Sequence, residues 1–513
     1  MNLERRIIIG LITSTEYLQQ IHSVWNADLL ESQMAKRLAG WCTDYFEKYF
    51  KAPGRNIEGI YYEKLKAGLP KDIAEEIEED ILPGLSEEYE QEQFNLSYLL
   101  DQTRVFLKER NLIRHTEKIQ EALDGGELLE AEKMALDYKP VISGGGADID
   151  LSSDTALQRV DKAFSKATKP VVKFPGALGE FWNSQLIRGG FVALLASDKR
   201  GKSYWLLEIA IRGRKQGAQV AFFQAGDMTE GQQLKRICVY LTKRSDLKKY
   251  SGEMWQPVKD CVLNQLDTCD KEIRECDFGV FENRTEKEVR EQITLSELKR
   301  LLKENPDYRP CYNCEEYDHR PIGSGWIEKV DTGNPLTVKE AKEAIETFFI
   351  QNKRRFKLST HANGTLTIKE IKALLDIWER EDGFVPDIIA IDYADLLVPE
   401  TRTEFRHQVD EIWKGLRNLS QERHCLVITA TQADARSYEQ NRLKVSNFSE
   451  DKRKNAHVTA MYGLNQDPKD REKQLGWMRI NEIVIREGDF SNSNEVYVLQ
   501  NLRRGRPFLG SFW

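Results

Sequence analysis

The 513-residue sequence lacks any apolar run that approaches the ~20 residues a membrane-spanning helix needs. Its N-terminal stretch also lacks the small-residue cleavage site of a secretory signal peptide. Internal repeats and low-complexity tracts are absent as well. These absences argue against a membrane partner and for a cytoplasmic protein. The length favours two or more globular domains.

The sequence also lacks the positive net charge expected of a nucleic-acid-binding protein, since its formal charge is −8. The charge is unevenly distributed. Residues 1–150 hold 17 Lys and Arg against 29 Asp and Glu, a net of −12, and the remainder has a net of +4. A weakly positive remainder can bind phosphates where its cations converge, so a nucleic-acid partner is compatible with the acidic total.

Cysteine is sparse, with eight residues in the chain. In a cytoplasmic protein we expect them to be mostly reduced. Cys42, Cys238 and Cys425 are scattered among apolar neighbours, which predicts buried free thiols. The other five fall in one stretch, between residues 261 and 314.

Residues 1–140 have apolar side chains at helical spacing, which predicts an all-α N-terminal domain. Residues 141–170 begin with a run of glycines, typical of a flexible linker, and continue into a short helix. That helix has Leu157, Val160 and Phe164 on one face. A helix so short is unstable alone, so we expect this face to dock, either on its own domain or elsewhere.

In residues 171–513, short runs rich in Val, Ile, Ala and Phe alternate with helical segments. Such runs are typical of strands buried on both faces of a parallel sheet. The alternation predicts a doubly wound, mostly parallel α/β core. A polar insertion at about 250–335 interrupts this core and carries the five clustered cysteines.

The stretch ASDKRGKS lies between a predicted strand and a predicted helix and nearly matches the phosphate loop G-x-x-x-x-G-K-[ST]. In such a loop backbone N–H groups face the phosphates, the lysine reaches the β- and γ-phosphates, and the hydroxyl contacts Mg²⁺. An alanine replaces the first glycine, which is tolerated where the position needs no positive φ. The predicted ATP-binding residues are Ala196, Ser197, Asp198, Lys199, Arg200, Gly201, Lys202 and Ser203.

Two other predicted strands lead into acidic residues. Asp392 ends the run FVPDIIAID, where a carboxylate supports the Mg²⁺ beside a phosphate loop. Asp227 follows the run AQVAFFQ, where a carboxylate can orient or deprotonate the attacking water. Asp227 can also cap the helix that follows it, and the two roles are compatible. Together with the loop, these residues predict nucleotide hydrolysis.

Five stretches of the sequence resemble, in chain order, the motifs of DnaB-like replicative helicases, within the RecA-like hexameric ATPases. They are ASDKRGKS, QAGDM, AIDYADLL, TATQAD and NLRRG. The first position of that family's phosphate loop is commonly alanine. The segment KFPGALGEF also resembles the start of the family's motor domain. The resemblance covers residues 171–513 and, more loosely, the helical domain and linker helix. The cysteine-bearing insertion makes this sequence more similar to the helicases of phages or mobile elements than to the housekeeping helicases of the family.

The resemblance implies that five residues are catalytic: Lys202, Asp227, Asp392, Gln432 and Arg503. Lys202 and Ser203 bind ATP and Mg²⁺, and Asp392 supports the metal. Asp227 replaces the family's catalytic glutamate and is one methylene shorter. Gln432 is similar to the polar residue that couples the γ-phosphate to the DNA-binding loops.

The resemblance also matches Arg503 to an arginine finger that reaches the ATP of the neighbouring subunit. A salt bridge is the alternative explanation for an arginine at this position. Asn501 stands where the family usually has a second cation, and Arg504 or Arg506 are candidates to replace it.

The segment after Gln432 matches the family's DNA-loop region only loosely. Its cations are candidate phosphate contacts, although a charge run is usually a solvated surface. In a ring, each cation is repeated around the channel, so that the charges converge. The candidates are Arg436, Arg442, Lys444, Lys452, Arg453 and Lys454.

The insertion contains one Cys-x-x-Cys pair and three cysteines before it. Two cysteine pairs brought together in a cytosolic protein usually bind tetrahedral zinc. We predict Cys261, Cys269, Cys311 and Cys314 as ligands, with Cys276 in reserve. A redox pair is the alternative for the Cys-x-x-Cys.

These patterns favour an ATP-dependent DNA helicase that translocates on single-stranded DNA as a homo-hexamer, with ATP, Mg²⁺ and Zn²⁺ as cofactors. Primase or a helicase loader are further candidate partners. Two alternatives stay open. One is a RecA-like DNA-stimulated ATPase that acts in recombination or defence without processive unwinding. The other is a nucleotide-gated assembly scaffold.

Overall fold

The structure is a computed structural model that describes residues 3–22, 25–80, 95–136, 160, 169–272, 274–314, 323–351, 355–400, 405–447 and 452–513. Within these ranges no helix is both long and apolar enough to cross a bilayer. The chain divides into two compact units, Met1–Ala167 with Leu375–Val385, and Thr168–Leu374 with Pro386–Trp513. Of the predicted linker and docking helix, most residues, including Leu157 and Phe164, lie outside the described ranges.

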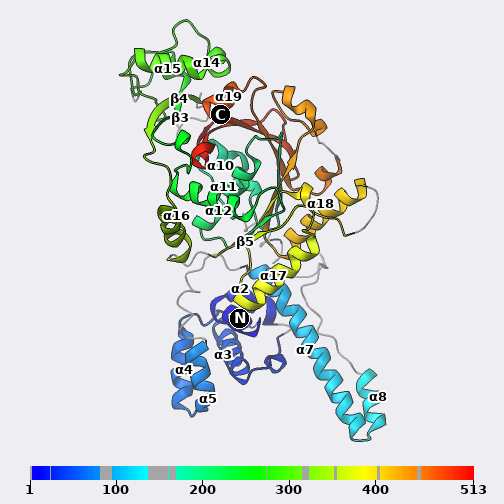
Figure 1. The fold of residues 1–513 in the computed structure, drawn as a ribbon. Coiled ribbons are helices and arrows are strands. Elements are labelled where there is room, and N and C mark those ends of the chain that lie inside the picture. The colour runs from blue at the N-terminus through cyan, green and yellow to red at the C-terminus, as the bar shows by residue number, and fades with distance from the viewer. Residues whose placement is uncertain are drawn as a thin grey trace. The chain divides into compact units, whose positions relative to one another are not determined.

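The described residues of the first unit form helices that pack around an apolar core (Figure 1). Ser14 and Ser32 begin two of them, because each side chain accepts the backbone N–H three residues on, at 3.1 and 3.3 Å. The core includes Ile8 and Leu99, both fully buried. The all-α prediction is confirmed. The elements are α1 (Leu3–Thr13), α2 (Thr15–Ile21), η2 (Ala27–Leu29), α3 (Gln33–Tyr49), α4 (Asn56–Lys66), α5 (Lys71–Asp80), α7 (Leu96–Asp124) and α8 (Leu128–Leu136).

The second unit is built on a nine-stranded sheet in the order β11-β10-β9-β8-β1-β7-β6-β2-β5. The strands from β8 to β5 are parallel, and β9, β10 and β11 extend the β8 edge as antiparallel strands. The strands are β1 (Phe191–Ala196), β2 (Val220–Gln224), β5 (Phe356–Thr360), β6 (Ile388–Asp392), β7 (Leu426–Gln432), β8 (Ala460–Asn465), β9 (Trp477–Ile485), β10 (Glu495–Asn501) and β11 (Arg506–Phe512).

Helices cover both faces of this sheet, which is the predicted doubly wound arrangement (Figure 1). Alternate β1 residues, Val192 and Leu194, pack with α10, α11 and α12 in one apolar core. On the other face Phe191 packs against Trp413 of α18, with ring centroids 5.5 Å apart. Outside the insertion the α-helices are α10 (Gly176–Trp182), α11 (Lys202–Lys215), α12 (Glu230–Thr242), α16 (Val338–Ile345), α17 (Ile368–Asp382), α18 (Phe405–Glu422) and α19 (Arg471–Leu475). The part of α17 from Leu375 on belongs to the first unit.

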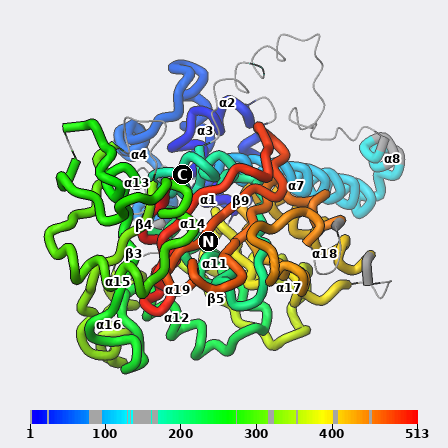
Figure 2. The backbone as a smooth tube through the Cα atoms, turned by 90° about the horizontal axis from the view of Figure 1, so that it is seen from above, coloured from blue at the N-terminus to red at the C-terminus, as the bar shows by residue number. Residues whose placement is uncertain are grey.

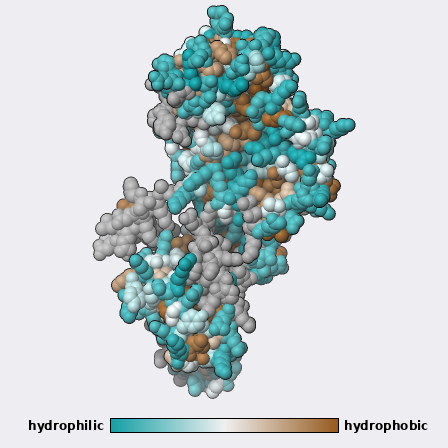
Figure 3. Space-filling view, turned by 90° about the vertical axis from the view of Figure 1, so that its left-hand side faces the viewer, coloured by the Kyte–Doolittle hydropathy of each residue, from teal (hydrophilic) through white to brown (hydrophobic). Residues whose placement is uncertain are grey.

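In the view of Figure 3, hydrophilic side chains cover most of the described surface of the second unit, and apolar areas lie between them.

Short helices and single turns connect the elements of the second unit. The connecting elements are η3 (Asn183–Gln185), η4 (Lys248–Tyr250), the π-helical η5 (Glu346–Ile350), η6 (Ala394–Leu396), η7 (Ala435–Glu439), η8 (Val445–Asn447), η9 (Lys452–Ala456) and η10 (Leu502–Arg504).

The polar insertion forms an antiparallel ribbon with small helices, on the opposite side of the second unit from α18 (Figure 2). Its core is continuous with the antiparallel end of the large sheet through Trp477 and Phe512. Two ribbon glycines allow this contact: a Cβ at Gly323 would lie 2.2 Å from Phe512 Cβ, and one at Gly325 would lie 2.4 Å from Trp477 Cζ2. The elements are β3 (Glu253–Cys261), α13 (Val262–Gln265), α14 (Glu286–Gln292), α15 (Leu295–Glu304) and β4 (Gly323–Asp331).

One buried carboxylate organises the insertion. Asp260 accepts from the Cys261 and Cys311 backbone N–H groups, at 2.8 and 2.9 Å, and from Tyr308 Oη and Gln265 Nε2, each at 2.8 Å. Burial raises the pKa of Asp260 to about 6, while these hydrogen bonds act in the opposite direction. The group is therefore ionised at pH 7, facing several donors.

Replacing Asp260 with alanine is expected to destabilise the insertion by roughly 3 kcal/mol or more, because several buried donors lose their acceptor. The matched control is Asp277→Ala, since the Asp277 side chain is 90% exposed and pairs with Arg274 at the surface. Thermal unfolding and limited proteolysis within the insertion measure the effect. Equal stability of the two variants would contradict the assignment.

Candidate nucleotide site

The predicted phosphate loop connects β1 to α11 at the carboxyl edge of the parallel strands. Gly201 is the N-cap of α11 and has φ of 89°, a left-handed conformation that favours glycine. Ala196 is an extended residue of β1, paired in register with Gln432. An alanine is therefore accommodated at the first motif position, and the glycine that the loop geometry requires is Gly201.

Lys202 is buried beneath the loop. Its Nζ donates to the Ala196 carbonyl at 3.3 Å and lies 5.5 Å from the centroid of the Tyr393 ring. Burial lowers the pKa of Lys202, and four nearby carboxylates raise it: Asp198, Asp395, Asp227 and Asp392. A buried cation beside a loop of backbone N–H groups is suited to an anionic ligand.

Ser203 and Asp392 are in direct contact, because Ser203 Oγ donates to Asp392 Oδ1 at 2.9 Å. Strand β7 separates β1 from β6, so the contact spans the intervening strand. Asp392 is fully buried, and burial raises its pKa to about 6, while the Ser203 hydrogen bond acts to lower it. Oxygen ligands of this kind are those that Mg²⁺ prefers.

Sequence reasoning missed Gln224, the last residue of β2. With its amide oriented to satisfy both neighbours, Gln224 donates to Asp392 Oδ2 at 3.0 Å and accepts from the Met228 N–H at 3.2 Å. It links the carboxylate of Asp392 to the turn that carries Asp227. The sequence offers one signal for this role, which is that the apolar run AQVAFFQ ends in a glutamine. The structure shows that this glutamine is fully buried.

Asp227 lies on the exposed turn between β2 and α12. The prediction that it caps α12 is wrong, because the N-cap is Thr229, which forms a capping box with Gln232. Gly226 has a φ of 108° and packs closely against the β5–α17 loop, because a Cβ atom on Gly226 would lie 2.3 Å from the Asn363 backbone. Asp227 lines a cavity of about 370 Å³ with Gly226, Met228, Thr229, Glu230, Gln232, Thr360, His361 and Ala362.

Gln432 ends β7, and its backbone N–H donates to Asp395 Oδ2 at 3.0 Å. The same carboxylate pairs with Lys454 Nζ at 2.7 Å and accepts from Thr431 Oγ1. Lys454 is fully buried. We therefore correct its prediction as a DNA contact: its charge is neutralised inside the protein.

The other five predicted DNA contacts differ in their exposure. Arg436, Lys444 and Arg453 are exposed. Arg442 is half-buried and pairs with Glu495, with Nη2 and Oε1 3.1 Å apart. Lys452 begins η9, and its side chain lies outside the described part of the structure.

Arg503 is exposed in η10, between β10 and β11, and its guanidinium lies 5.0 Å from the centroid of the Tyr250 ring. The alternative of a salt bridge is not found, since no ion pair of Arg503 occurs among the described residues. The side chain of the neighbouring residue Leu502 packs against the phosphate loop: a Cβ atom on Gly201 would lie 3.0 Å from Leu502 Cδ1. Arg503 is thus far from the loop in sequence but close to it in the fold.

The predicted zinc site is not assembled: no group of three or more His, Cys, Asp or Glu side chains in the described ranges is placed to hold a metal. Cys261, Cys269, Cys311 and Cys314 are free thiols. Burial raises the pKa of the Cys261 and Cys311 thiols in this structure. The Sγ of the reserve ligand Cys276 instead lies 3.5 Å from Asn264 Oδ1 and 3.6 Å from the Phe278 and Arg309 carbonyl oxygens, so that its one proton has three acceptors within reach.

The prediction of buried free thiols is confirmed for Cys42 and Cys425. It is wrong for the burial of Cys238, which is free but only half-buried. Burial raises the pKa of Cys425 to about 12, so that its thiol stays protonated.

The chain matches no family model, and no curated protein matches it. It is similar to the solved ATPase domain of G40P, at 15% identity and a TM-score of 0.44, over 71% of this chain and 100% of that one. It is also similar to a DnaB-like replicative helicase whose structure was described with its interactions with primase, at 14% identity and a TM-score of 0.42, over 98% of each chain. The parallel strand order, the loop after β1 and the helices on both faces give the second unit a doubly wound α/β fold.

Proposed function

We propose that the chain is an ATP-dependent DNA helicase, which translocates on single-stranded DNA as a homo-hexameric ring. The observation that carries this proposal is the convergence of Lys202, Ser203, Asp392 and Asp227 at one edge of the sheet. The carboxylates of Asp198, Asp227, Asp392 and Asp395 lie close enough to Lys202 to raise its pKa against the larger effect of burial. The order of motifs along the chain supports the helicase class.

The residues of the site divide the chemistry of hydrolysis. The backbone N–H groups before α11 and the Lys202 ammonium bind the phosphates of ATP. Ser203 and Asp392 are the residues that would hold Mg²⁺, and when bound this ion neutralises charge on the β- and γ-phosphates. Asp227 orients the attacking water and accepts its proton, and Gln224 holds Asp392 in place.

Replacing Asp227 with asparagine is expected to leave ATP binding intact and to lower turnover about 10²-fold, because the amide cannot accept the proton. Equilibrium nucleotide binding and phosphate release measure the two effects separately. Glu230→Gln is the matched control, since Glu230 is an exposed carboxylate that lines the same cavity. Undiminished turnover in Asp227→Asn, with loss in Glu230→Gln, would move the role to Glu230.

Strand displacement tests the function as a whole. We expect the purified chain to separate a forked DNA duplex in the presence of ATP and Mg²⁺, and not with a non-hydrolysable ATP analogue. ATP turnover that is stimulated by DNA without strand displacement would instead favour the recombination or defence ATPase. Nucleotide binding without turnover would favour the assembly scaffold.

A further inference from the structure

The side chain of Arg200, in the phosphate loop, is directed into the protein. Its guanidinium is buried, and Nη1 donates to Gln466 Oε1 at 3.0 Å and to Asp470 Oδ1 at 3.1 Å. Both acceptors belong to the turn between β8 and α19. Lys199 and Gly201, on either side of Arg200, have positive φ, of 59° and 89°. Arg200 therefore anchors the loop at the point where its backbone is left-handed.

The turn that receives Arg200 is itself held by hydrogen bonds. Gln466 is 5% exposed, and its Nε2 donates to the Trp477 carbonyl of β9 at 2.7 Å. The Asp470 N–H donates to the Asp467 carbonyl at 3.1 Å, and Asp467 Oδ1 accepts the Glu472 N–H at 2.8 Å. Asp470 is also left-handed, with φ of 54°, a conformation that aspartate adopts more readily than most residues. The two acceptors of Arg200 therefore have fixed positions.

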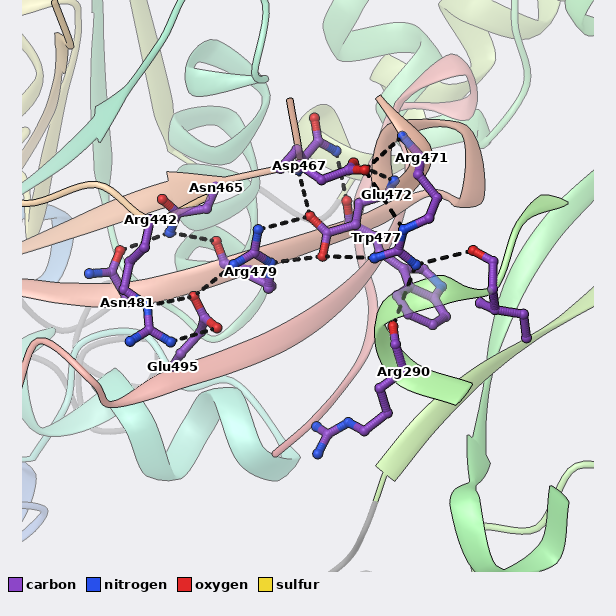
Figure 4. Close-up of polar contacts among 12 residues, drawn as sticks. Arg290, Arg442, Asn465, Asp467, Arg471, Glu472, Trp477, Arg479, Asn481 and Glu495 are labelled. Atoms are coloured by element: carbon purple, nitrogen blue, oxygen red, sulfur yellow. Dashed lines mark hydrogen bonds and ion pairs between the residues drawn. The ribbon is translucent and has the colours of Figure 1, made fainter. Parts of the chain in front are cut away.

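The residue after Asp470 binds the insertion (Figure 4). Arg471 Nη1 donates to the Ile293 carbonyl at 3.1 Å and to the Arg290 carbonyl at 3.4 Å, at the C-terminal end of α14. Carbonyls at a helix C-terminus lack intrahelical partners and carry partial negative charge, so a cation stabilises them. The Arg471 guanidinium also lies 5.9 Å from the ring centroid of Trp477, a residue of the insertion's core. Two consecutive residues thus bind the phosphate loop and the insertion.

Carboxylates beside Arg471 belong to a larger ion network, which Figure 4 shows. Arg471 lies 3.7 Å from both Asp467 and Glu472. Glu472 pairs with Arg479 at 2.7 Å, and Arg479 pairs with Glu495 at 3.4 Å. Burial lowers the pKa of Arg479, but Glu472 and Glu495 more than offset this and raise the pKa overall. The network therefore holds Arg471 in its orientation toward α14.

From these contacts we propose that Gln466 and Asp470 position the phosphate loop for ATP through Arg200, and that Arg471 makes the insertion part of this support. Gln466 and Asp470 are positioning residues, because they act through Arg200 rather than on the nucleotide. The proposal rests on the proposed function, since it concerns the same ATP site. It deepens that function by naming the insertion as a determinant of nucleotide affinity.

Preorganisation of the loop is the physical reason for this effect. Backbone N–H groups bind phosphate oxygens where they converge on one point. A loop released from the Arg200 contacts would have to be ordered when ATP binds, and that ordering lowers the affinity. The Arg200–Asp470 contact is a charge-assisted hydrogen bond from a buried guanidinium, which is stronger than a neutral one. A contact that served stability alone would change the unfolding of the chain and leave its affinity for ATP unchanged.

Equilibrium binding of a fluorescent, non-hydrolysable ATP analogue to the full chain, with Mg²⁺ present, tests the positioning role. Asp470→Gly is expected to weaken binding about tenfold, because glycine keeps the left-handed backbone and removes the acceptor. Arg200→Ala should weaken binding at least as much, and the double variant no further than Arg200→Ala, because the two changes remove one shared contact. Asp267→Gly is the matched control, since Asp267 also has a positive φ, of 55°, and pairs with Arg274 at 2.9 Å.

Arg471 variants test the role of the insertion in the same assay. Arg471→Ala is expected to weaken analogue binding several-fold, and to have no further effect in the Asp470→Gly background, because the insertion acts through the same turn. Arg300→Ala, which removes an exposed arginine of α15 that pairs with Glu304, is the matched control. Thermal unfolding of each variant shows whether the chain is folded during the measurement.

Unchanged affinity in a folded Asp470→Gly protein, or an equal loss in Asp267→Gly, would overturn the positioning role. Unchanged affinity in a folded Arg471→Ala protein, or a loss that adds to that of Asp470→Gly, would remove the insertion from the support. The assay needs neither hydrolysis nor DNA. Affinity that depends on Asp470 in a chain that displaces no strand would therefore support this proposal while contradicting the helicase proposal.

Discussion

Replacing Lys202 with alanine is expected to lower ATP turnover by roughly 10²- to 10³-fold or more. Lys202 is the buried cation directly beneath the phosphate loop, and it is surrounded by carboxylates. Without it, negative charge that develops on the transferring phosphoryl group would face Asp198, Asp227, Asp392 and Asp395 with less compensation. Phosphate release under saturating ATP measures the effect.

The variant must be shown to fold for this result to be informative. The Nζ of Lys202 makes one hydrogen bond to a backbone carbonyl that also accepts from Ala433, so we expect near-native thermal unfolding. Lys173→Ala, which removes an exposed lysine of the same unit, is the control. Wild-type turnover in a folded Lys202→Ala protein would mean that this loop is not the site of hydrolysis.

Replacing Arg503 with alanine is expected to lower turnover on the order of 10³-fold, with assembly and ATP binding preserved, if its guanidinium stabilises charge on the γ-phosphate. The guanidinium is exposed and stacks on Tyr250, so its removal breaks no ion pair in the described structure. Arg504→Ala is the matched neighbour, since Arg504 already donates to the Lys243 carbonyl at 3.0 Å. A loss confined to Arg504→Ala would contradict the role of Arg503.

Mixed rings show which subunit's site Arg503 serves. The contact of Leu502 with Gly201 brings η10 beside the phosphate loop of its own chain. In rings mixed from Lys202→Ala and Arg503→Ala subunits, action on the neighbour predicts partial recovery of turnover, because some interfaces combine an intact site with an intact finger. An absence of recovery in rings shown to be hexameric would indicate action within one chain.

Local patterns were sufficient to predict the elements that position the site. The apolar runs at β1, β2, β6 and β7 became parallel strands, and their carboxyl ends meet because parallel strands share a direction. The same strands bring Ser203 within hydrogen-bond distance of Asp392. The phosphate loop contains a single glycine, and that glycine, Gly201, is the left-handed N-cap of α11; Lys199 of the same loop also has a positive φ, of 59°.

Pairing between distant side chains could not be predicted in the same way. Lys454 looked like its neighbour Arg453 in sequence, but a carboxylate 59 residues earlier neutralises it in the interior. Arg442 likewise pairs with Glu495, 53 residues later. Composition records the charges, whereas burial and partners depend on the tertiary fold.

The cysteines of the insertion illustrate the same limit. Their spacing suggested a metal, yet Asp260 occupies the centre of the insertion and binds the backbone at Cys261 and Cys311. The hydrogen bonds of this single carboxylate organise the segment that zinc was expected to hold together. A lone aspartate in a strand gives no sequence signal of that role.

The proposed helicase function is tested most directly by the steady-state rate of phosphate release by the purified chain, measured with and without single-stranded DNA and alongside Lys202→Ala. We expect Mg²⁺-dependent ATP hydrolysis that single-stranded DNA accelerates and that is lost in Lys202→Ala. A rate that is equal in the two proteins, or one that DNA leaves unchanged, would contradict it.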